Sequence, residues 1–214
     1  LIPLRDMGMG LTFDPGPRFD HLIDTVRRAE GLGSPAYGSH TDVARCIATI
    51  REVVGNRAAV LGFIGAPFTV AGFAIAGAGR QRSAPLAQAL APREATLDAL
   101  QHRLVPNLVA YAGVQADAGA DVIQVFESLA SDVPVDTYRR IGLPWLLQTI
   151  RLLRAAHPQT PVIVFGRGLW PVIGDIAATG VACLSLDETR PLAQARQELL
   201  ALGLNTALQG NLDP

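Results

Sequence analysis

Several short apolar runs of this chain are each followed directly by polar or charged side chains. Carboxylates, hydroxyls, amides and guanidinium groups of this kind can together bind a small polar or anionic substrate. Any one of them could merely cap a helix or solvate a loop, but the pattern recurs after four runs, which favours a shared site. The side chains are Glu127 and Ser128, then Arg167, then Asp187 and Glu188, and finally Gln209, Asn211 and Asp213.

The apolar runs themselves predict buried strands. They are rich in Val, Ile, Leu and Phe and are bounded by Gly, Pro or Asn, as in strands that are covered on both faces. Stretches with apolar residues at steps of three and four lie between them and predict helices. Alternation of this kind indicates a parallel sheet with right-handed crossovers. The expected strands are 59–64, 122–126, 162–165, 181–186 and 206–208, and the expected helices are 42–54, 97–118, 138–156, 171–178 and 191–202.

Two closed architectures fit this alternation, a doubly wound sheet and a (β/α)8 barrel. A doubly wound sheet usually has a glycine-rich phosphate turn after its first strand, but Gly77-Ala78-Gly79 follows a helical stretch instead. A barrel places its functional groups at the carboxyl ends of several strands, as this sequence does. Because there is no linker, repeat or low-complexity tract, residues 1–214 are expected to form one domain.

Composition narrows the class of protein further. Hydrophobic residues make up 49% of the chain, charged residues 17%, and the net charge is −1, which gives no sign of nucleic-acid binding. No apolar run reaches the ~18 residues of a membrane span, and there is no charged-then-apolar signal peptide at the start. Cys46 and Cys183 have no close partner in the sequence and are expected to be buried free thiols. A cytoplasmic protein is the prediction.

The chain resembles the uroporphyrinogen decarboxylase family in segments that cover almost its whole length. The segments occur in the family's order, and most of them lie at expected strand ends. They are 7–19, similar to ALGM…GPxF; 62–69, similar to GFxGAPxT; 124–128, similar to Q-(I/L)-F-(D/E)-S; 162–168, similar to a strand ending in FGKG; 184–187, similar to VGLD; and 209–214, which reads QGNLDP.

The resemblance implies a (β/α)8 barrel and a specific reaction. Family members remove carboxyl groups from the four acetate side chains of uroporphyrinogen III and give coproporphyrinogen III in haem biosynthesis. No cofactor is expected, because protonation of a pyrrole α-carbon makes the ring itself the electron sink. The implied partner is this small-molecule substrate, with no nucleic acid and no membrane, and a homodimer is the expected assembly of the full-length protein.

The resemblance also implies which residues line the substrate site, although it assigns no catalytic residue within this chain. Arg167 stands where the family usually has Lys, and Phe73 stands where it has a tyrosine whose hydroxyl can hydrogen-bond in the site. Arg80 and Arg82 lie in a loop that could reach peripheral carboxylates. The expected substrate-binding residues are Phe126, Ser128, Arg167, Gln209, Asn211, Phe73, Arg80 and Arg82.

Other parts of the family's site cannot be placed in this sequence. These are its RQAGRY segment, a central aspartate and a histidine of the last strand; His21, His40, His102 and His157 lie on expected helices or loops. Segment matching therefore predicts an incomplete barrel of about five to six strands, corresponding to strands three to seven. On this interpretation the isolated chain is inactive.

Two alternatives remain. One is a zinc-dependent, cobamide-linked methyltransferase of the same superfamily, whose relatives have a His-x-Cys pair after the strand that corresponds to 162–165. Here those positions are filled from Phe165-Gly166-Arg167, and no cluster of Cys and His is present to bind zinc. The other is a non-catalytic remnant or pseudoenzyme that binds a tetrapyrrole or a protein partner.

Overall fold

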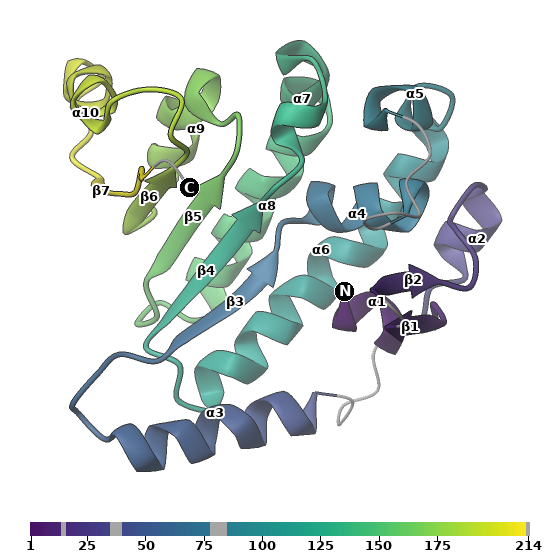
Figure 1. Cartoon of the computed structure of the whole chain (residues 1–214), viewed down its shortest axis with the longest axis horizontal. Helices are drawn as coiled ribbons and strands as arrows, with labels where there is room; N and C mark the ends of the chain where they lie inside the picture. The colour runs from purple at the N-terminus through teal and green to yellow at the C-terminus, as the bar shows by residue number, and fades with distance from the viewer. Residues whose placement is uncertain (14–15, 35–39, 78–84, 213–214) are drawn as a thin grey trace.

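The computed structural model describes residues 1–13, 16–34, 40–77 and 85–212. Its centre is a sheet of five parallel strands in the order β3-β4-β5-β6-β7, which is also their order along the chain (Figure 1). The prediction of at least five parallel strands in chain order is confirmed. The strands are β3 (Leu61–Gly65), β4 (Val122–Glu127), β5 (Val162–Gly166), β6 (Cys183–Leu186) and β7 (Ala207–Gln209).

A helical segment joins each strand to the next. Shorter helices lie between the end of a strand and the longer helix that leads back to the next one. The segments are α3 (Thr41–Val54) before β3; α4 (Pro67–Ala76), α5 (Leu86–Leu90) and α6 (Glu94–Asp117) before β4; η2 (Ala130–Asp132), α7 (Val135–Arg140) and α8 (Gly142–Ala156) before β5; η3 (Trp170–Val172) and α9 (Ile173–Ala177) before β6; and α10 (Leu192–Ala201) before β7.

Two helix predictions need correction. The single helix expected over 138–156 is two helices, α7 and α8, which meet at Ile141. Pro144 has no N–H to donate to the carbonyl of Arg140, so a continuous helix would lose a hydrogen bond at this point. The helix expected to begin at Pro191 begins at Leu192, and Pro191 is its N-cap.

The sheet is covered by helices on one face. In β3 the side chain of Ile64 is buried, whereas Leu61 and Phe63 are 50% and 61% exposed. Figure 1 shows α6 and α8 behind β3, β4 and β5, and both helices contact the sheet. The strands were expected to be covered on both faces; among the described residues, the face of β3 that bears Leu61 and Phe63 has no such cover. Sequential strands with helices on one side form the wall of a barrel, here an open one, and this excludes a doubly wound sheet.

The first thirty residues form elements that the sequence did not predict. They are α1 (Ile2–Asp6), an antiparallel pair of β1 (Leu11–Phe13) and β2 (Pro17–Phe19), and α2 (Val26–Glu30). The backbone N–H of Ile23 donates to the carbonyl of Ala74 at 2.8 Å, which joins this part to α4. Within the described ranges, no helix is both long and apolar enough to cross a membrane.

Candidate functional site

The register of the sheet brings several strand-end side chains into one row. Phe126 of β4 pairs with Phe165 of β5, Phe165 with Ser185 of β6, and Ser185 with Gln209 of β7. Because side chains alternate along a strand, all of these point away from the covering helices. Ser128 and Arg167 each follow two residues after a member of this row, and the N–H of Arg167 donates to the carbonyl of Glu127 at 3.1 Å. Of the residues predicted to bind substrate, four therefore gather at one end of this face.

Aromatic rings cover part of this open face. The rings of Phe63 and Phe126 have centroids 5.9 Å apart and lie edge to face, and those of Phe126 and Phe165 are 5.6 Å apart and tilted. Rings in such contact stabilise one another and form a firm apolar surface. The face can therefore accept a flat apolar ring, with polar groups available at its strand-end margin.

The guanidinium of Arg167 stands at that margin. Its side chain is 55% exposed, and it lies 3.6 Å from a carboxylate oxygen of Glu188. An exposed ion pair of this kind contributes roughly 0–1 kcal/mol. An anionic ligand can therefore compete with Glu188 for Arg167 at little cost.

Asp187 holds the loops behind this margin together. It is 4% exposed and accepts hydrogen bonds from the N–H of Gly168 at 2.7 Å and the indole Nε1–H of Trp170 at 2.8 Å. The N–H of Thr189 donates to it at 3.2 Å, and the Thr189 hydroxyl donates as well. Burial acts to raise the pKa of Asp187, but these hydrogen bonds outweigh burial and hold the pKa below its usual value. Asp187 thus serves as a structural anion that fixes the loops after β5 and β6.

The amide side chains of Gln209, which ends β7, and of Asn211, which follows it, have different partners. Gln209 is exposed, and its Nε2 donates to the hydroxyl of Ser185 at 3.3 Å. Nδ2 of Asn211 donates to the carbonyl of Asp187 at 3.1 Å and to that of Arg190. Gln209 is therefore part of the open face, whereas the NH2 group of Asn211 holds the loop after β6.

The remaining predicted site residues lie in or after α4. Phe73 is partly buried on α4 and packs against the hydrophobic core. Arg80 and Arg82 lie outside the described residues, and so does Asp213.

Sequence reasoning treated Glu127 as one more strand-end polar group and missed its direction. It is fully buried on the opposite side of β4 from Phe126, and it accepts hydrogen bonds from the hydroxyls of Thr69 and Tyr138, the latter at 3.3 Å. Burial raises the pKa of Glu127 to about 7. Alternation along the strand could have shown this, because Glu127 has the same parity as the core residues Ile123 and Val125.

His40 also differs from its expected ordinary role on a loop. It is 6% exposed, its Nδ1 lies 3.1 Å from a carboxylate oxygen of Asp6, and its ring meets Tyr111 edge to face at 4.7 Å. These residues belong to the loop before α3, to α1 and to α6, so the pair lies among the helices and not in the strand-end row.

The described part of the chain gives no support to a metal site. Within it, no group of three or more His, Cys, Asp or Glu side chains could hold a metal ion. Cys46 on α3 and Cys183 on β6 are free thiols as expected, but Cys46 is exposed and Cys183 only partly buried, so the expected burial is wrong.

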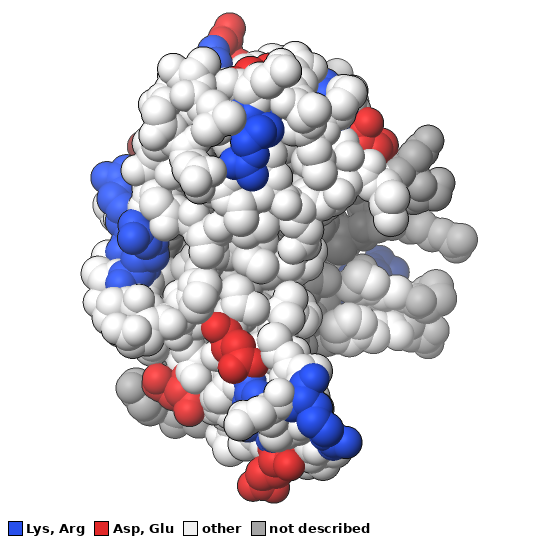
Figure 2. All heavy atoms as spheres, turned by 90° about the vertical axis from the view of Figure 1, so that its left-hand side faces the viewer, with Lys and Arg blue, Asp and Glu red and all other residues white. Residues whose placement is uncertain are grey.

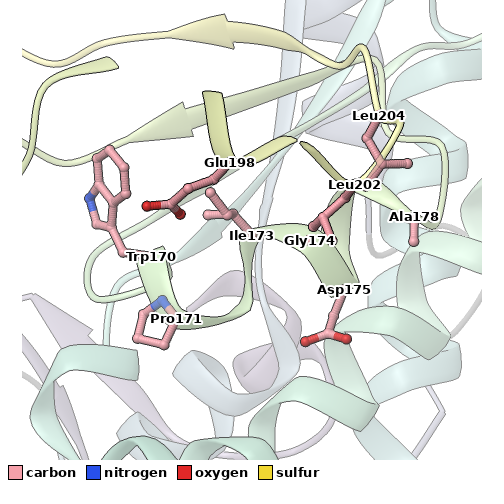
Figure 3. Close-up of a pocket in the computed structure, with 9 residues that line it drawn as sticks. All are labelled: Trp170, Pro171, Ile173, Gly174, Asp175, Ala178, Glu198, Leu202 and Leu204. Atoms are coloured by element: carbon pink, nitrogen blue, oxygen red, sulfur yellow. The ribbon is translucent and has the colours of Figure 1, made fainter. Parts of the chain in front are cut away.

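A separate hollow of about 510 Å³ lies on the outer side, between η3, α9 and α10 (Figure 3). Apolar side chains such as Ile173, Leu202 and Leu204 and the carboxylates of Asp175 and Glu198 line it. None of its lining residues belongs to the strand-end row. Figure 2 shows that acidic and basic side chains are interspersed over the neighbouring surface, which forms no extended patch of one charge.

Comparison with known proteins agrees with the geometry. The chain matches the family described as "Uroporphyrinogen decarboxylase (URO-D)" over residues 1–214. It is 33% identical over 219 residues to uroporphyrinogen decarboxylase of Microcystis aeruginosa, covering 100% of this chain and 61% of that protein. It is 35% identical over 225 residues to the chloroplastic enzyme of Nicotiana tabacum (100% and 55% covered) and 32% identical over 212 residues to that of Synechocystis sp. (97% and 60% covered). The chain thus spans roughly three fifths of the length of these relatives.

Proposed function

The chain belongs to the uroporphyrinogen decarboxylase family, and we propose that the protein carrying it is a carboxy-lyase that converts uroporphyrinogen III to coproporphyrinogen III. The observation that supports this most directly is the row of Phe126, Phe165, Ser185 and Gln209, with Ser128 and Arg167 at its margin. This row joins an apolar surface for a ring to polar groups for its acetate side chains.

Four side chains of the row and its margin have roles that follow from their chemistry. Phe126 lies against the face of a pyrrole ring, and Arg167 leaves Glu188 to pair with a substrate carboxylate. Ser128 and Gln209 hydrogen-bond to acetate or pyrrole groups. We assign these residues to substrate binding and orientation, and we assign proton delivery to none of them.

The reaction balances without any cofactor. A proton adds to a pyrrole α-carbon, and the resulting cationic ring accepts the electron pair released when the bond from the acetate methylene to its carboxylate breaks. Carbon dioxide leaves, and a second proton converts the methylene to a methyl group as the first is lost from the ring. Pre-organised groups around the developing charge are the protein's main contribution to the rate.

The remaining proposals concern the whole protein. We propose that residues 1–214 belong to one barrel domain, because the helices and the sheet share one hydrophobic core. A cytoplasmic protein fits the cyanobacterial relatives, although other relatives are named chloroplastic. A homodimer is proposed from the usual assembly of the family.

Since Phe63 is 61% exposed, we propose that turnover requires the complete protein, in which this face can be enclosed.

Substitutions that reverse or keep the positive charge of Arg167 test its role. In the complete protein, Arg167→Glu is expected to lower kcat/KM for uroporphyrinogen about 100-fold, because it places a like charge against the substrate carboxylates. Arg167→Lys keeps the charge and is expected to lose less than about tenfold. The measurement is an anaerobic assay that resolves the seven-, six-, five- and four-carboxyl products by chromatography. Equal activity of all three proteins would remove Arg167 from the site.

Phe73 favours one competing function, a non-catalytic protein that binds a tetrapyrrole, because it lacks the hydroxyl of the family's tyrosine. Phe73→Tyr is expected to raise kcat/KM severalfold in an active protein, as one hydrogen bond contributes about 1 kcal/mol. The same chromatographic assay measures kcat/KM of the wild type and of Phe73→Tyr. Absence of turnover in both the complete wild-type protein and Phe73→Tyr, with uroporphyrin binding retained, would establish the non-catalytic alternative.

A further inference from the structure

A buried chain of hydrogen bonds lies directly behind the strand end that carries Ser128. The backbone N–H of Ser128 donates to Oγ1 of Thr69 at 2.8 Å, and the hydroxyl of Thr69 donates in turn to a carboxylate oxygen of Glu127. Tyr138 donates to the other oxygen at 3.3 Å. All three side chains are buried: Thr69 is 3% exposed, Glu127 0% and Tyr138 2%.

The direction of these bonds is determined by chemistry. A hydroxyl has one proton to donate and lone pairs that accept, so Thr69 can donate to Glu127 and accept from the N–H of Ser128 at the same time. The carboxylate of Glu127 has no proton to give when ionised and accepts from Thr69, from Tyr138 and from the backbone N–H of Leu129. The orientation of the Thr69 hydroxyl, and with it the bond to Ser128, is therefore set by Glu127.

The network joins elements that are distant in sequence. Thr69 lies in the first turn of α4, Glu127 ends β4, and Tyr138 lies on α7. A second bond, from the N–H of Ala66 to the carbonyl of Phe126 at 2.8 Å, joins the same strand end to the start of α4. Phe73 follows Thr69 by one helical turn. A shift of Thr69 would thus move both Ser128 and the helix that carries Phe73.

We propose that Thr69 and Glu127 are positioning residues for the proposed reaction: they fix the strand end after β4 so that Ser128 is presented at the correct place on the open face. They lie behind the sheet and touch no substrate, so their effect passes through Ser128. This inference rests on the proposed function, because Ser128 binds substrate only if that function is right.

The test compares three substitutions in the complete protein. Thr69→Val preserves the shape of the side chain and removes its hydroxyl, whereas Thr69→Ser keeps the hydroxyl. Thr149→Val is the matched control, because Thr149 is also fully buried and donates its hydroxyl only locally, to the carbonyl of Trp145 at 2.8 Å. We expect kcat/KM to fall about tenfold in Thr69→Val, to recover in Thr69→Ser and to be unchanged in Thr149→Val.

A double substitution separates positioning from a general loss of stability. If Thr69 acts through the side chain of Ser128, Thr69→Val should have less than about a twofold effect on kcat/KM in a Ser128→Ala background. An undiminished tenfold loss in that background would overturn the proposal, and so would an equal loss in Thr149→Val.

Hydrogen exchange provides a readout that does not depend on turnover. The amide of Ser128 should exchange about tenfold faster in Thr69→Val than in the wild type or Thr69→Ser, because it loses its acceptor. If the complete wild-type protein shows no decarboxylation but this difference is found, the proposed function fails while the positioning of the strand end by Thr69 stands. If exchange at Ser128 is the same in all variants, the positioning role is wrong, whatever the activity.

Discussion

Replacement of Asp187 by Ala is expected to lower the free energy of unfolding by about 3 kcal/mol or more, because buried donors lose their shared acceptor. The N–H of Gly168 and the indole N–H of Trp170 both point at this carboxylate, which is 4% exposed. Gly168 lies in the loop after β5 and Trp170 begins η3, whereas Asp187 itself follows β6. Its loss should therefore loosen the part of the margin that carries Arg167.

Urea unfolding at pH 7.5, followed by tryptophan fluorescence and circular dichroism, measures the effect. Asp175→Ala is the control, since Asp175 is an exposed carboxylate on α9 and its loss should change stability by less than about 0.5 kcal/mol. The pKa of Asp187 is lowered in the fold, so its stabilising effect is present above the ordinary aspartate pKa and disappears as the pH falls through the folded value. If the free energy of unfolding of Asp187→Ala fell by less than about 1 kcal/mol, water would be satisfying the N–H groups of Gly168 and Trp170 instead.

The strands of the sheet could be predicted because each is short, apolar and bounded by turn residues. The run at 122–126, for example, became β4 (Val122–Glu127) with one further residue. The strands β1 and β2 could not be predicted in this way, because half of their six side chains are exposed and neither strand is an apolar run. Their pairing is formed by backbone hydrogen bonds, which leave no pattern in the sequence.

The direction of polar side chains was harder to predict than the position of strand ends. Phe126 and Phe165 lie on the open face, as their parity in β4 and β5 indicates, but Glu127, one residue after Phe126, points into the core. Strand parity separates these cases, whereas the resemblance to a family motif does not. Beyond the last paired residue parity no longer applies, and for this reason Asp187 and Asn211 could be assigned to loop support only from their hydrogen bonds.

The strand ends carry exposed polar residues that can bind a ligand and buried ones that hold the surrounding backbone in place. Arg167 and Gln209 are exposed and can exchange their partners, whereas Glu127 and Asp187 are buried and have several donors each. Groups that bind a substrate precisely need neighbours that hold them in place. The chain has no lysine, and its 18 basic residues are all arginine, so the guanidinium at position 167 follows the usage of the whole chain and needs no special explanation at the site.

Glu127→Gln is expected to remove a pH dependence from the stability of the protein. Burial raises the pKa of Glu127 from 4.5 to about 7, against the hydrogen bonds from Thr69, Leu129 and Tyr138, which lower it. Between these two pH values the folded state keeps a proton that the unfolded state has released. The free energy of unfolding of the wild type should therefore fall as the pH rises from about 4.5 to 7, by about 2.5 kcal/mol.

The measurement is the difference in unfolding free energy between the wild type and Glu127→Gln, from urea titrations at pH 5, 6, 7 and 8. Ionisable groups other than Glu127 are present in both proteins, and their effects cancel in the difference. That difference should decline by about 2.5 kcal/mol from pH 5 to pH 8 and be level above pH 7.5. Glu94→Gln is the matched control, because the side chain of Glu94 is 79% exposed and its variant should run parallel to the wild type. A difference that stays constant within about 0.5 kcal/mol for Glu127→Gln would show that Glu127 is ionised throughout, with its three donors sufficient to offset its burial.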